Sequence, residues 1–199
     1  MVTVRRAGRD ALLVDCAGLE EATALHAEVR RRGLAVRDLV PAAATVLLDG
    51  LADPAGTAEQ IGAWRLEAVE TPPGRLVELP TTYDGPDLGA VADQWGLTEE
   101  DVVELHLATE FRVAFCGFAP GFAYCTGLPE DRTVARRSDP RASVPAGSVG
   151  LAGPWTAVYP TASPGGWQLI GRTEVRLWDA GSEQPALLPP GTRVRFVRG

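Results

Sequence analysis

Three motifs rich in glycine and proline follow one another in the second half of the chain. They read FCGFAPGFAYCTGLP (115–129), VPAGSVGLAG (144–153) and SPGGWQLIGRT (163–173). Glycines let the backbone approach a ligand closely and present N–H groups to it. Arginines stand among these motifs, and their forked guanidinium groups bind carboxylate or phosphate through two hydrogen bonds. These residue types in this arrangement predict an anion-binding pocket.

The positive charge of this region runs against the trend of the whole chain. Residues 111–172 contain six arginines and three carboxylates, whereas the formal charge of the chain is −7. The six arginines are Arg112, Arg132, Arg136, Arg137, Arg141 and Arg172. The excess suggests the hypothesis that an anion lies against Arg137, Arg141 and Arg172.

His106, one of two histidines, lies in the segment TEEDVVELHLA (98–108). Thr98 and Asp101 form the start of a capping box, which predicts a helix. At about 100° per residue, His106 falls inside the apolar arc of that helix. A buried, hydrogen-bonded histidine is the commoner interpretation of such a position, and a catalytic histidine is the alternative. His26, on an earlier predicted helix, is interpreted as a surface or packing residue.

Other residues in the motifs have structural alternatives. No helical pattern follows GSVGLAG (147–153), so its glycines do not predict a dinucleotide site, and tight turns explain them equally well. Ser148 lies in AGSVG, which lacks the first glycine of a nucleophile elbow. Asp84 and Asp87 favour helix capping over magnesium binding. The aromatic residues either stack on a ligand or fill the interior of the fold; they are Phe118, Phe122, Tyr124, Trp155 and Trp167.

Composition narrows the class of protein. A chain of 199 residues with 45% hydrophobic content forms one large domain or two small ones. No apolar run approaches the roughly 20 residues that span a bilayer, and MVTVRRAGRD at the start lacks the apolar core of a signal peptide. Cys16, Cys116 and Cys125 have no metal-type spacing, so we expect reduced thiols and no metal site. A pI near 4.9 argues against a nucleic-acid binder. We therefore expect a cytoplasmic protein without nucleic-acid or membrane partners.

The sequence contains no lysine, since all 19 basic residues are arginine. A Walker-type phosphate lysine, a Schiff-base lysine and covalently attached biotin are therefore excluded from this chain.

The pattern along the chain predicts an α+β fold of two domains, residues 1–81 and 82–199. In the first domain, strands and helices alternate in a way typical of a ferredoxin-like arrangement. The expected elements are an apolar run at 11–14, a helix at 19–33, a strand ending at 45–50, a helix over 57–69 that starts at Asp53 and Pro54, and a strand at 75–80. In the second domain, helices at 87–95 and 98–108 precede short β-branched and aromatic runs with Gly/Pro turns, as in a closed or nearly closed β-barrel.

From about Tyr83 to Thr173 the chain resembles the family of the 5-oxoprolinase B subunit, also called allophanate hydrolase subunit 1 or KipI-like. The motifs that carry the resemblance are GPDL, the helix ending in His106, GFAPGFAYCTGLP, RRSDPRASVPAGSVGLAG and YPTASPGGWQLIGRT. The resemblance implies a small α+β domain followed by a cyclophilin-like β-barrel. It implies no prolyl isomerase activity, because fold likeness does not carry function.

The resemblance also implies a function in a complex. The family works with a C subunit as its partner (KipA-like, allophanate hydrolase subunit 2) and with a third subunit in the ATP-dependent opening of 5-oxoproline to glutamate. We expect this small-molecule substrate, and ATP with Mg bound at the partner interface. Two alternatives remain open: a regulatory protein that inhibits a sensor histidine kinase, and a carboxyltransferase-type module with biotin on another chain.

The resemblance assigns roles to particular residues. It makes His106 a general acid/base candidate, with Arg137 and Arg141 as catalytic charge clamps for developing oxyanions. The substrate-binding candidates are Phe118, Pro120, Gly121, Phe122, Tyr124, Arg136, Ser148, Ser163, Gly165, Gly166, Trp167 and Arg172. Two residues depart from the family pattern: Trp155 replaces a glutamine, and Cys125 replaces an aliphatic residue.

Overall fold

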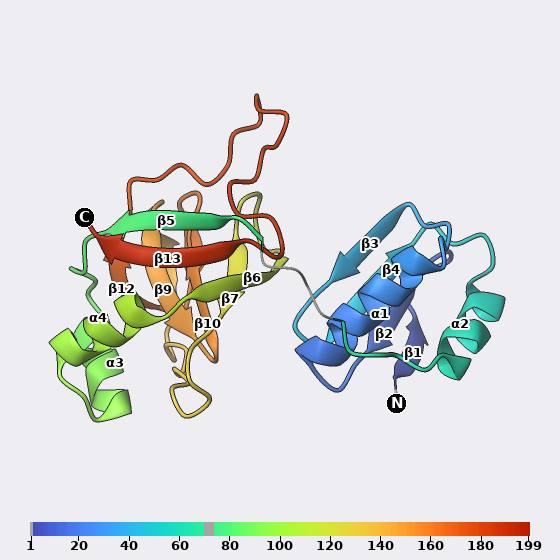
Figure 1. The fold of residues 1–199 in the computed structure, drawn as a ribbon, viewed down its shortest axis with the longest axis horizontal. Helices are drawn as coiled ribbons and strands as arrows, with labels where there is room; N and C mark the ends of the chain where they lie inside the picture. Colours follow the sequence, from blue (N-terminus) through green and yellow to red (C-terminus); the bar gives the residue numbers. More distant parts are fainter. Residues whose placement is uncertain (1, 70–73) are drawn as a thin grey trace. The chain divides into compact units, whose positions relative to one another are not determined.

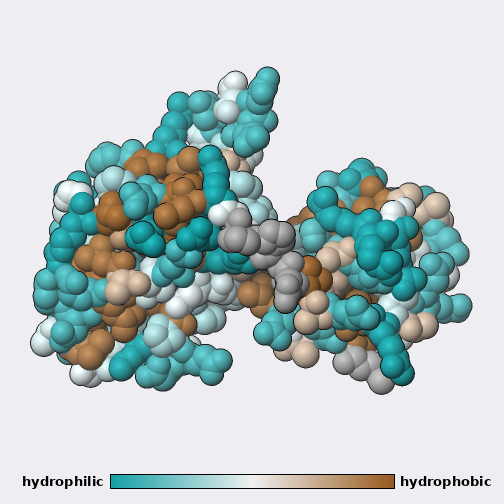
Figure 2. Space-filling view, in the orientation of Figure 1, coloured by the Kyte–Doolittle hydropathy of each residue, from teal (hydrophilic) through white to brown (hydrophobic). Residues whose placement is uncertain are grey.

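The computed structural model describes residues 2–69 and 74–199. These residues form two compact units, which divide between residues 71 and 72 (Figure 1). Hydrophobic residues on the face shown in Figure 2 occur in patches among hydrophilic ones on both units. No helix within the described ranges has the length and apolar character needed to cross a membrane.

The first unit is a four-stranded antiparallel sheet with two helices. The strand order is β1-β2-β4-β3. Its elements are β1 (Thr3–Arg6), β2 (Leu12–Asp15), α1 (Leu19–Arg31), β3 (Asp38–Pro41), β4 (Thr45–Asp49) and α2 (Pro54–Ala63). Apolar residues of β2 and β4 alternate with more exposed ones, and they pack with Leu25, Val29 and Ile61 of the helices into one core.

Helix α2 begins where the sequence predicts. The Asp53 side chain accepts a hydrogen bond from the Gly56 N–H at 3.0 Å, and Pro54 occupies the first helical position. The helix ends at Ala63 rather than continuing to residue 69, because Trp64 adopts an extended conformation. The Trp64 ring instead lies 4.6 Å from the Arg32 guanidinium carbon, a cation–π contact.

The expected ferredoxin-like connection is not present in the first unit. Residues 3–15 form two strands rather than one, joined by a tight turn in which Gly8 has φ +102°. The order of elements is therefore two strands and a helix, repeated. The strand order β1-β2-β4-β3 is the order of a ferredoxin-like sheet whose last strand stands first in the chain. The sequence predicted one strand in this segment, at the apolar run 11–14, and missed β1 and the turn after it.

The second unit is a seven-stranded, nearly closed barrel with strand order β12-β9-β10-β7-β6-β13-β5. Hydrogen bonds between Thr82 and Arg172, at 2.9 and 2.8 Å, join the chain just after β5 to β12 and so connect the sheet's two ends. The barrel strands are β5 (Leu76–Thr81), β6 (Phe111–Cys116), β7 (Ala123–Thr126), β9 (Ser148–Ala152), β10 (Trp155–Val158), β12 (Gln168–Arg172) and β13 (Arg193–Arg198). A separate pair consists of β8 (Arg141–Val144) and β11 (Ser163–Gly165).

The predicted boundary at residue 81 is wrong, because β5 belongs to the barrel. It pairs in parallel with β13 over six residues, from Leu76 opposite Arg193 to Thr81 opposite Arg198. The two strands lie side by side in Figure 1. Since the partner strand lies at the far end of the sequence, no local pattern could assign β5 to the second unit.

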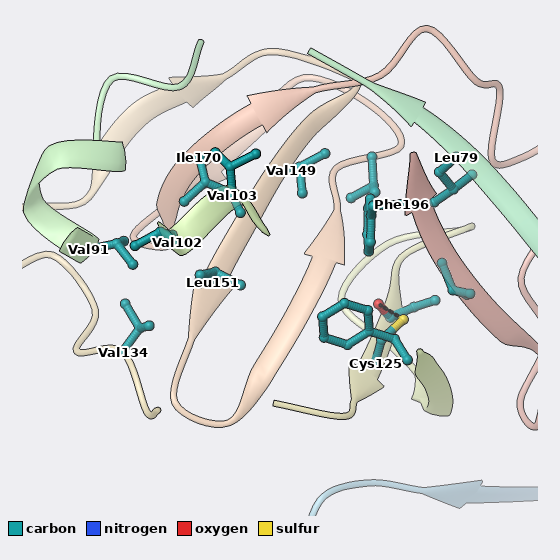
Figure 3. Close-up of a cluster of buried hydrophobic side chains, with 14 of the residues drawn as sticks. Leu79, Val91, Val102, Val103, Cys125, Val134, Val149, Leu151, Ile170 and Phe196 are labelled. Carbon is teal, nitrogen blue, oxygen red and sulfur yellow. Dashed lines mark hydrogen bonds between the residues drawn. The ribbon is translucent and has the colours of Figure 1, made fainter. Parts of the chain in front are cut away.

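Helices α3 (Leu88–Trp95) and α4 (Glu99–Ala108) pack against the interior face of the barrel sheet. The predicted capping box at the start of α4 is confirmed, with both Thr98 and Asp101 side chains bonded as expected. Valines of these helices meet strand residues such as Val149, Leu151, Ile170 and Phe196 (Figure 3). Because side chains alternate along a strand, each neighbour of an interior residue points to the outer face.

Candidate functional site

The outer face of β7, β10 and β12 carries a cluster of aromatic rings, here called the aromatic face. The Phe122 ring is central, with centroids 5.0 Å from Tyr124, 5.3 Å from Tyr159 and 5.5 Å from Trp167. The Trp155 ring lies 6.1 Å from Tyr124. Interleaved residues such as Ala123, Cys125 and Val158 point to the interior. Strand alternation therefore supplies this barrel with apolar residues on both faces.

Phe118 is the most exposed ring in this cluster and sits on an unusual backbone. Its φ is +67°, the only positive φ of a non-glycine residue in the described ranges, and the side chain is 61% exposed. The Ala119 N–H donates to the Gly117 carbonyl at 2.8 Å, so Phe118 is the centre of a γ-turn. Turns of this kind are strained, and such strain gathers at ligand-binding sites. The loop holds an apolar ring in solvent, edge-on to Phe122 at 5.2 Å.

The glycines of the motifs permit close approach. Gly121 has φ +86°, and a Cβ there would lie 2.9 Å from the Cβ of Trp178. A Cβ on Gly165 would lie 2.4 Å from the Tyr159 hydroxyl oxygen, whereas a Cβ on Gly166 would make only ordinary contacts, at 3.6 Å or more. Gly165 thus lets β11 lie directly over the Tyr159 hydroxyl.

This difference predicts unequal effects of two neighbouring substitutions. We expect Gly165→Ala to lower the free energy of unfolding by about 1–3 kcal/mol, because the added methyl overpacks the Tyr159 hydroxyl. Gly166→Ala is the matched control and should change it by less than about 0.5 kcal/mol. Urea unfolding measures both, and equal effects would contradict the close approach.

Arg137 and Arg141 are both bonded to Asp87. The Asp87 Oδ1 atom accepts from Arg137 Nη1 at 3.1 Å and from Arg141 Nη2 at 2.7 Å, and its Oδ2 atom accepts from the Leu169 N–H at 2.7 Å. Burial acts to raise the Asp87 pKa, but the Arg141 hydrogen bond, the Leu169 N–H and both guanidinium charges lower it below its ordinary value. Asp87 stands at the N-cap of α3 without capping it through its side chain. The expected capping role is corrected to that of a buried counter-ion.

Arg172 has a different partner. Its Nε atom donates to Asp84 Oδ2 at 2.9 Å, and both side chains are about half exposed. The three arginines expected to bind one anion are therefore engaged by three carboxylates: Asp87 pairs with Arg137 and Arg141, and both Asp84 and Glu174 pair with Arg172. Arg136 differs from all three, since its side chain makes no hydrogen bond or ion pair with any residue that the structure describes.

His106 lies in the barrel interior, with 0% of its surface exposed. Its Nδ1 atom is 2.7 Å from the Tyr83 hydroxyl and its Nε2 atom is 3.1 Å from Thr156 Oγ1, which in turn donates to the Gly150 carbonyl at 3.3 Å. One assignment of the protons satisfies all of these hydrogen bonds. The Tyr83 O–H donates to Nδ1, and the Nε2–H donates to Thr156. Burial lowers the His106 pKa to about 3, so the ring is neutral near pH 7.

This placement separates His106 from the aromatic face. Thr156, which holds the imidazole, points inward from β10, while its neighbours Trp155 and Ala157 pack on the outer face. The Phe111 and Phe196 rings lie 4.8 and 4.3 Å from the His106 ring. The geometry agrees with the buried, hydrogen-bonded histidine that the helical arc favoured.

The remaining candidates divide in the same way. The structure brings Phe118, Phe122, Tyr124, Gly165 and Trp167 together on or beside the aromatic face. Ser148 instead pairs with Arg172 across β9 and β12. Ser163 lies on β11, and its buried hydroxyl has no hydrogen-bond partner within residues 2–69 and 74–199. Pro120 lies within the Phe118 loop.

Sequence reasoning missed Tyr159 and Phe115 as members of the aromatic face. Phe115 stacks on Tyr124 at 4.5 Å and meets Trp155 edge-on at 5.2 Å. Alternation along residues 155–159 was the signal that would have placed Tyr159 on the same face as Trp155. Trp155, the departure from the family pattern, is thus part of the aromatic face itself.

The chain matches the family described as "Carboxyltransferase domain, subdomain C and D" over residues 2–188, and it belongs to this family. It is 51% identical over 144 residues to the B subunit of 5-oxoprolinase from Escherichia coli O157:H7. That match covers 70% of this chain and 66% of the relative. The resemblance drawn from the motifs is thereby confirmed.

Solved structures agree with this placement. The conserved uncharacterized protein PH0987 from Pyrococcus horikoshii is 34% identical, with a TM-score of 0.60 and coverage of 99% of this chain and 97% of that one. The Kluyveromyces lactis urea carboxylase has a TM-score of 0.76 at 19% identity, covering 100% of this chain and 22% of that one. The second likeness is one of fold alone.

Proposed function

We propose that the chain is a subunit of an ATP-dependent 5-oxoprolinase-type complex, in which the lactam of 5-oxoproline is hydrolysed to glutamate. The observation that carries the proposal is the 51% identity to a protein named as the B subunit of 5-oxoprolinase. The aromatic face adds support, because its Phe118 ring is exposed and the cationic Arg136 side chain near it is exposed as well.

In this proposal the chain supplies binding and charge stabilisation. Opening of an activated lactam develops negative charge on oxygen, which N–H donors and guanidinium groups stabilise. In this proposal Arg136 and the N–H groups of the Phe118 loop supply these donors. His106 has a structural role, since it is buried on the other side of the sheet. The acid–base groups come from the partner.

The partner in this proposal is a homologue of the C subunit, and the complex also contains a third 5-oxoprolinase subunit. ATP binds with Mg²⁺ at the interface with the partner. Across residues 2–69 and 74–199, no three His, Cys, Asp or Glu side chains group as metal ligands, and the proposal places the Mg²⁺ ion on the nucleotide.

We expect the purified chain alone to have little 5-oxoprolinase activity. Its exposed site has donors and rings but, in this proposal, no acid–base group of its own. Glutamate release is measured for the chain alone, for the remaining subunits without it, and for the mixture, with ATP and Mg²⁺ throughout. Only the mixture should release glutamate. Full activity from the isolated chain would contradict the proposal that the partner supplies the acid–base groups.

The family description favours one second candidate, a carboxyltransferase-type module. Biotin would then be carried by another chain, because this one contains no lysine. The two functions differ in cofactor dependence. Avidin added to the reconstituted mixture should leave 5-oxoproline hydrolysis unchanged, whereas a biotin-dependent carboxyl transfer would stop.

A further inference from the structure

Arg136 lies on a short backbone segment that is hydrogen-bonded on both sides. The Ala135 N–H donates to Gln94 Oε1 at 2.9 Å, and the Ala135 carbonyl accepts from Gln168 Nε2 at 3.1 Å. On the other side the Arg137 N–H donates to the Gly166 carbonyl at 2.8 Å. The Arg136 side chain is exposed and makes none of the hydrogen bonds or ion pairs found among the described residues. An ordered backbone thus presents a cation without a counter-charge.

The surroundings of this cation are phenolic and apolar. Burial raises the pKa of both Tyr124 and Tyr159, and the charge of Arg136 acts on both in the opposite direction, so the guanidinium lies near the two phenols. Gly165 of β11 lies against the Tyr159 hydroxyl, and the next residue, Gly166, accepts a hydrogen bond from the Arg137 N–H. The backbone beside Arg136 is therefore close to Tyr159. Phe118 lies edge-on to Tyr159 at 6.3 Å. The cation, the partly buried Tyr124 phenol and the exposed Phe118 ring therefore share one region of the outer side of the barrel, where Tyr159 is buried.

The charges of the region select the kind of anion. Arg137 and Arg141 are held by Asp87, and Arg172 by Asp84, so a single unpaired positive charge remains among the described residues of this region. One guanidinium matches one carboxylate in a two-pronged pair. The exposed Phe118 ring and the partly buried Tyr124 ring add apolar surface for the body of the ligand.

We propose that Arg136, with Phe118 and Tyr124, forms a binding site for the carboxylate of a small molecule whose ring lies against these two aromatic side chains. The inference rests on the proposed function for the identity of this molecule, a cyclic lactam carboxylate. The guanidinium pairs with the carboxylate, and the Phe118 side chain covers the ring. The anion site predicted from sequence thereby moves from Arg137, Arg141 and Arg172 to Arg136.

Calorimetry on the full chain tests the site directly. The probes are 5-oxoproline, benzoate, 2-pyrrolidinone and inorganic phosphate. We expect at least one of the two carboxylates to bind. We expect 2-pyrrolidinone and phosphate to bind at least about tenfold more weakly, because 2-pyrrolidinone lacks the carboxylate and phosphate lacks the ring that contacts Phe118. Arg136→Ala and Phe118→Ala should each weaken carboxylate binding about tenfold or more, and Arg136→Lys should retain part of it.

The control variant is Arg176→Ala, since this arginine is exposed and lies in the loop after β12. It should bind as the parent does. The Arg136 side chain has no hydrogen bond or ion pair to lose among the described residues, so the Arg136 variants should melt within about 2 °C of the parent. Failure of both carboxylates to bind, equal binding of phosphate, or unchanged binding by Arg136→Ala would overturn the inference.

The same variants in the reconstituted complex separate this inference from the proposed function. A complex inactive on 5-oxoproline, together with Arg136-dependent binding of benzoate, would reject the proposed function and keep the carboxylate site. An active complex whose KM for 5-oxoproline is unchanged by Arg136→Ala would keep the function and reject the site.

Discussion

Replacing Asp87 by alanine is expected to lower the free energy of unfolding of the barrel unit by about 3–5 kcal/mol. The substitution leaves Arg137 and Arg141, which are partly buried, close together without their shared buried carboxylate, and uncompensated charges of this kind are costly. It also removes the acceptor of the Leu169 N–H. Urea unfolding followed by fluorescence measures the effect, since four of the five tryptophans lie in the second unit.

Asp84→Ala is the matched control. Asp84 pairs with Arg172, but both side chains are about half exposed, and exposed pairs contribute at most about 1 kcal/mol. Equal losses in the two variants would show that Asp87 is not a buried counter-ion. Because the pKa of Asp87 is lowered in the folded state, its contribution should be present near pH 7 and disappear as the pH falls below the ordinary range of aspartate.

Replacing His106 by asparagine is expected to reduce stability and to leave turnover of the reconstituted complex near normal. Asparagine cannot span both Tyr83 and Thr156, so at least one buried hydrogen bond is lost, together with ring contacts to Phe111 and Phe196. The expected loss is about 1–3 kcal/mol. A catalytic histidine would give the opposite result, a loss of turnover of about 100-fold or more with little change in stability.

The pH dependence of stability gives an independent readout of His106. An unfolded histidine binds a proton below about pH 6.5, whereas burial keeps the folded His106 neutral down to about pH 3. The unfolded state therefore binds more protons in this window, and stability falls as the pH is lowered from 6.5 towards 3, by up to about 1.4 kcal/mol per pH unit. The difference between the parent and His106→Asn should shrink with falling pH.

His26→Asn is the control for both readouts. His26 is half-buried on α1, where burial and the charge of the nearby Arg30 both lower its pKa. It should change stability less than His106→Asn does. A parent and a His106 variant with parallel pH profiles would contradict the buried, neutral imidazole.

Local signals predicted the parts of the fold that depend on neighbouring residues. The capping box of Thr98 and Asp101 and the Asp53–Pro54 helix start involve residues at most a few positions apart, so the sequence displays them completely. The alternation of short apolar runs with Gly/Pro turns likewise predicted the barrel. The turn at Gly8 was missed because the flanking strands have only four residues each, too short for a clear alternation.

Long-range pairing could not be predicted in this way. The membership of β5 in the barrel depends on β13, and its apolar pattern fits either unit equally well. The same limit applies to charge. Six arginines and three carboxylates between 111 and 172 suggest a shared anion. The carboxylates that pair with Arg137, Arg141 and Arg172 lie outside that range; they are Asp84, Asp87 and Glu174.

The sequence by itself determined the chemistry available to this protein: arginine as its only strong base, glycine loops, and a set of aromatic residues at strand spacing. Tertiary structure decided which of these groups meet. Because neighbouring residues of β10 point to opposite faces, Thr156 holds His106 inside the barrel while Trp155 lies on the aromatic face. Because Asp84 and Asp87 fold back onto three arginines, Arg136 alone among the arginines of this site remains without a carboxylate partner in the part of the chain that the structure describes.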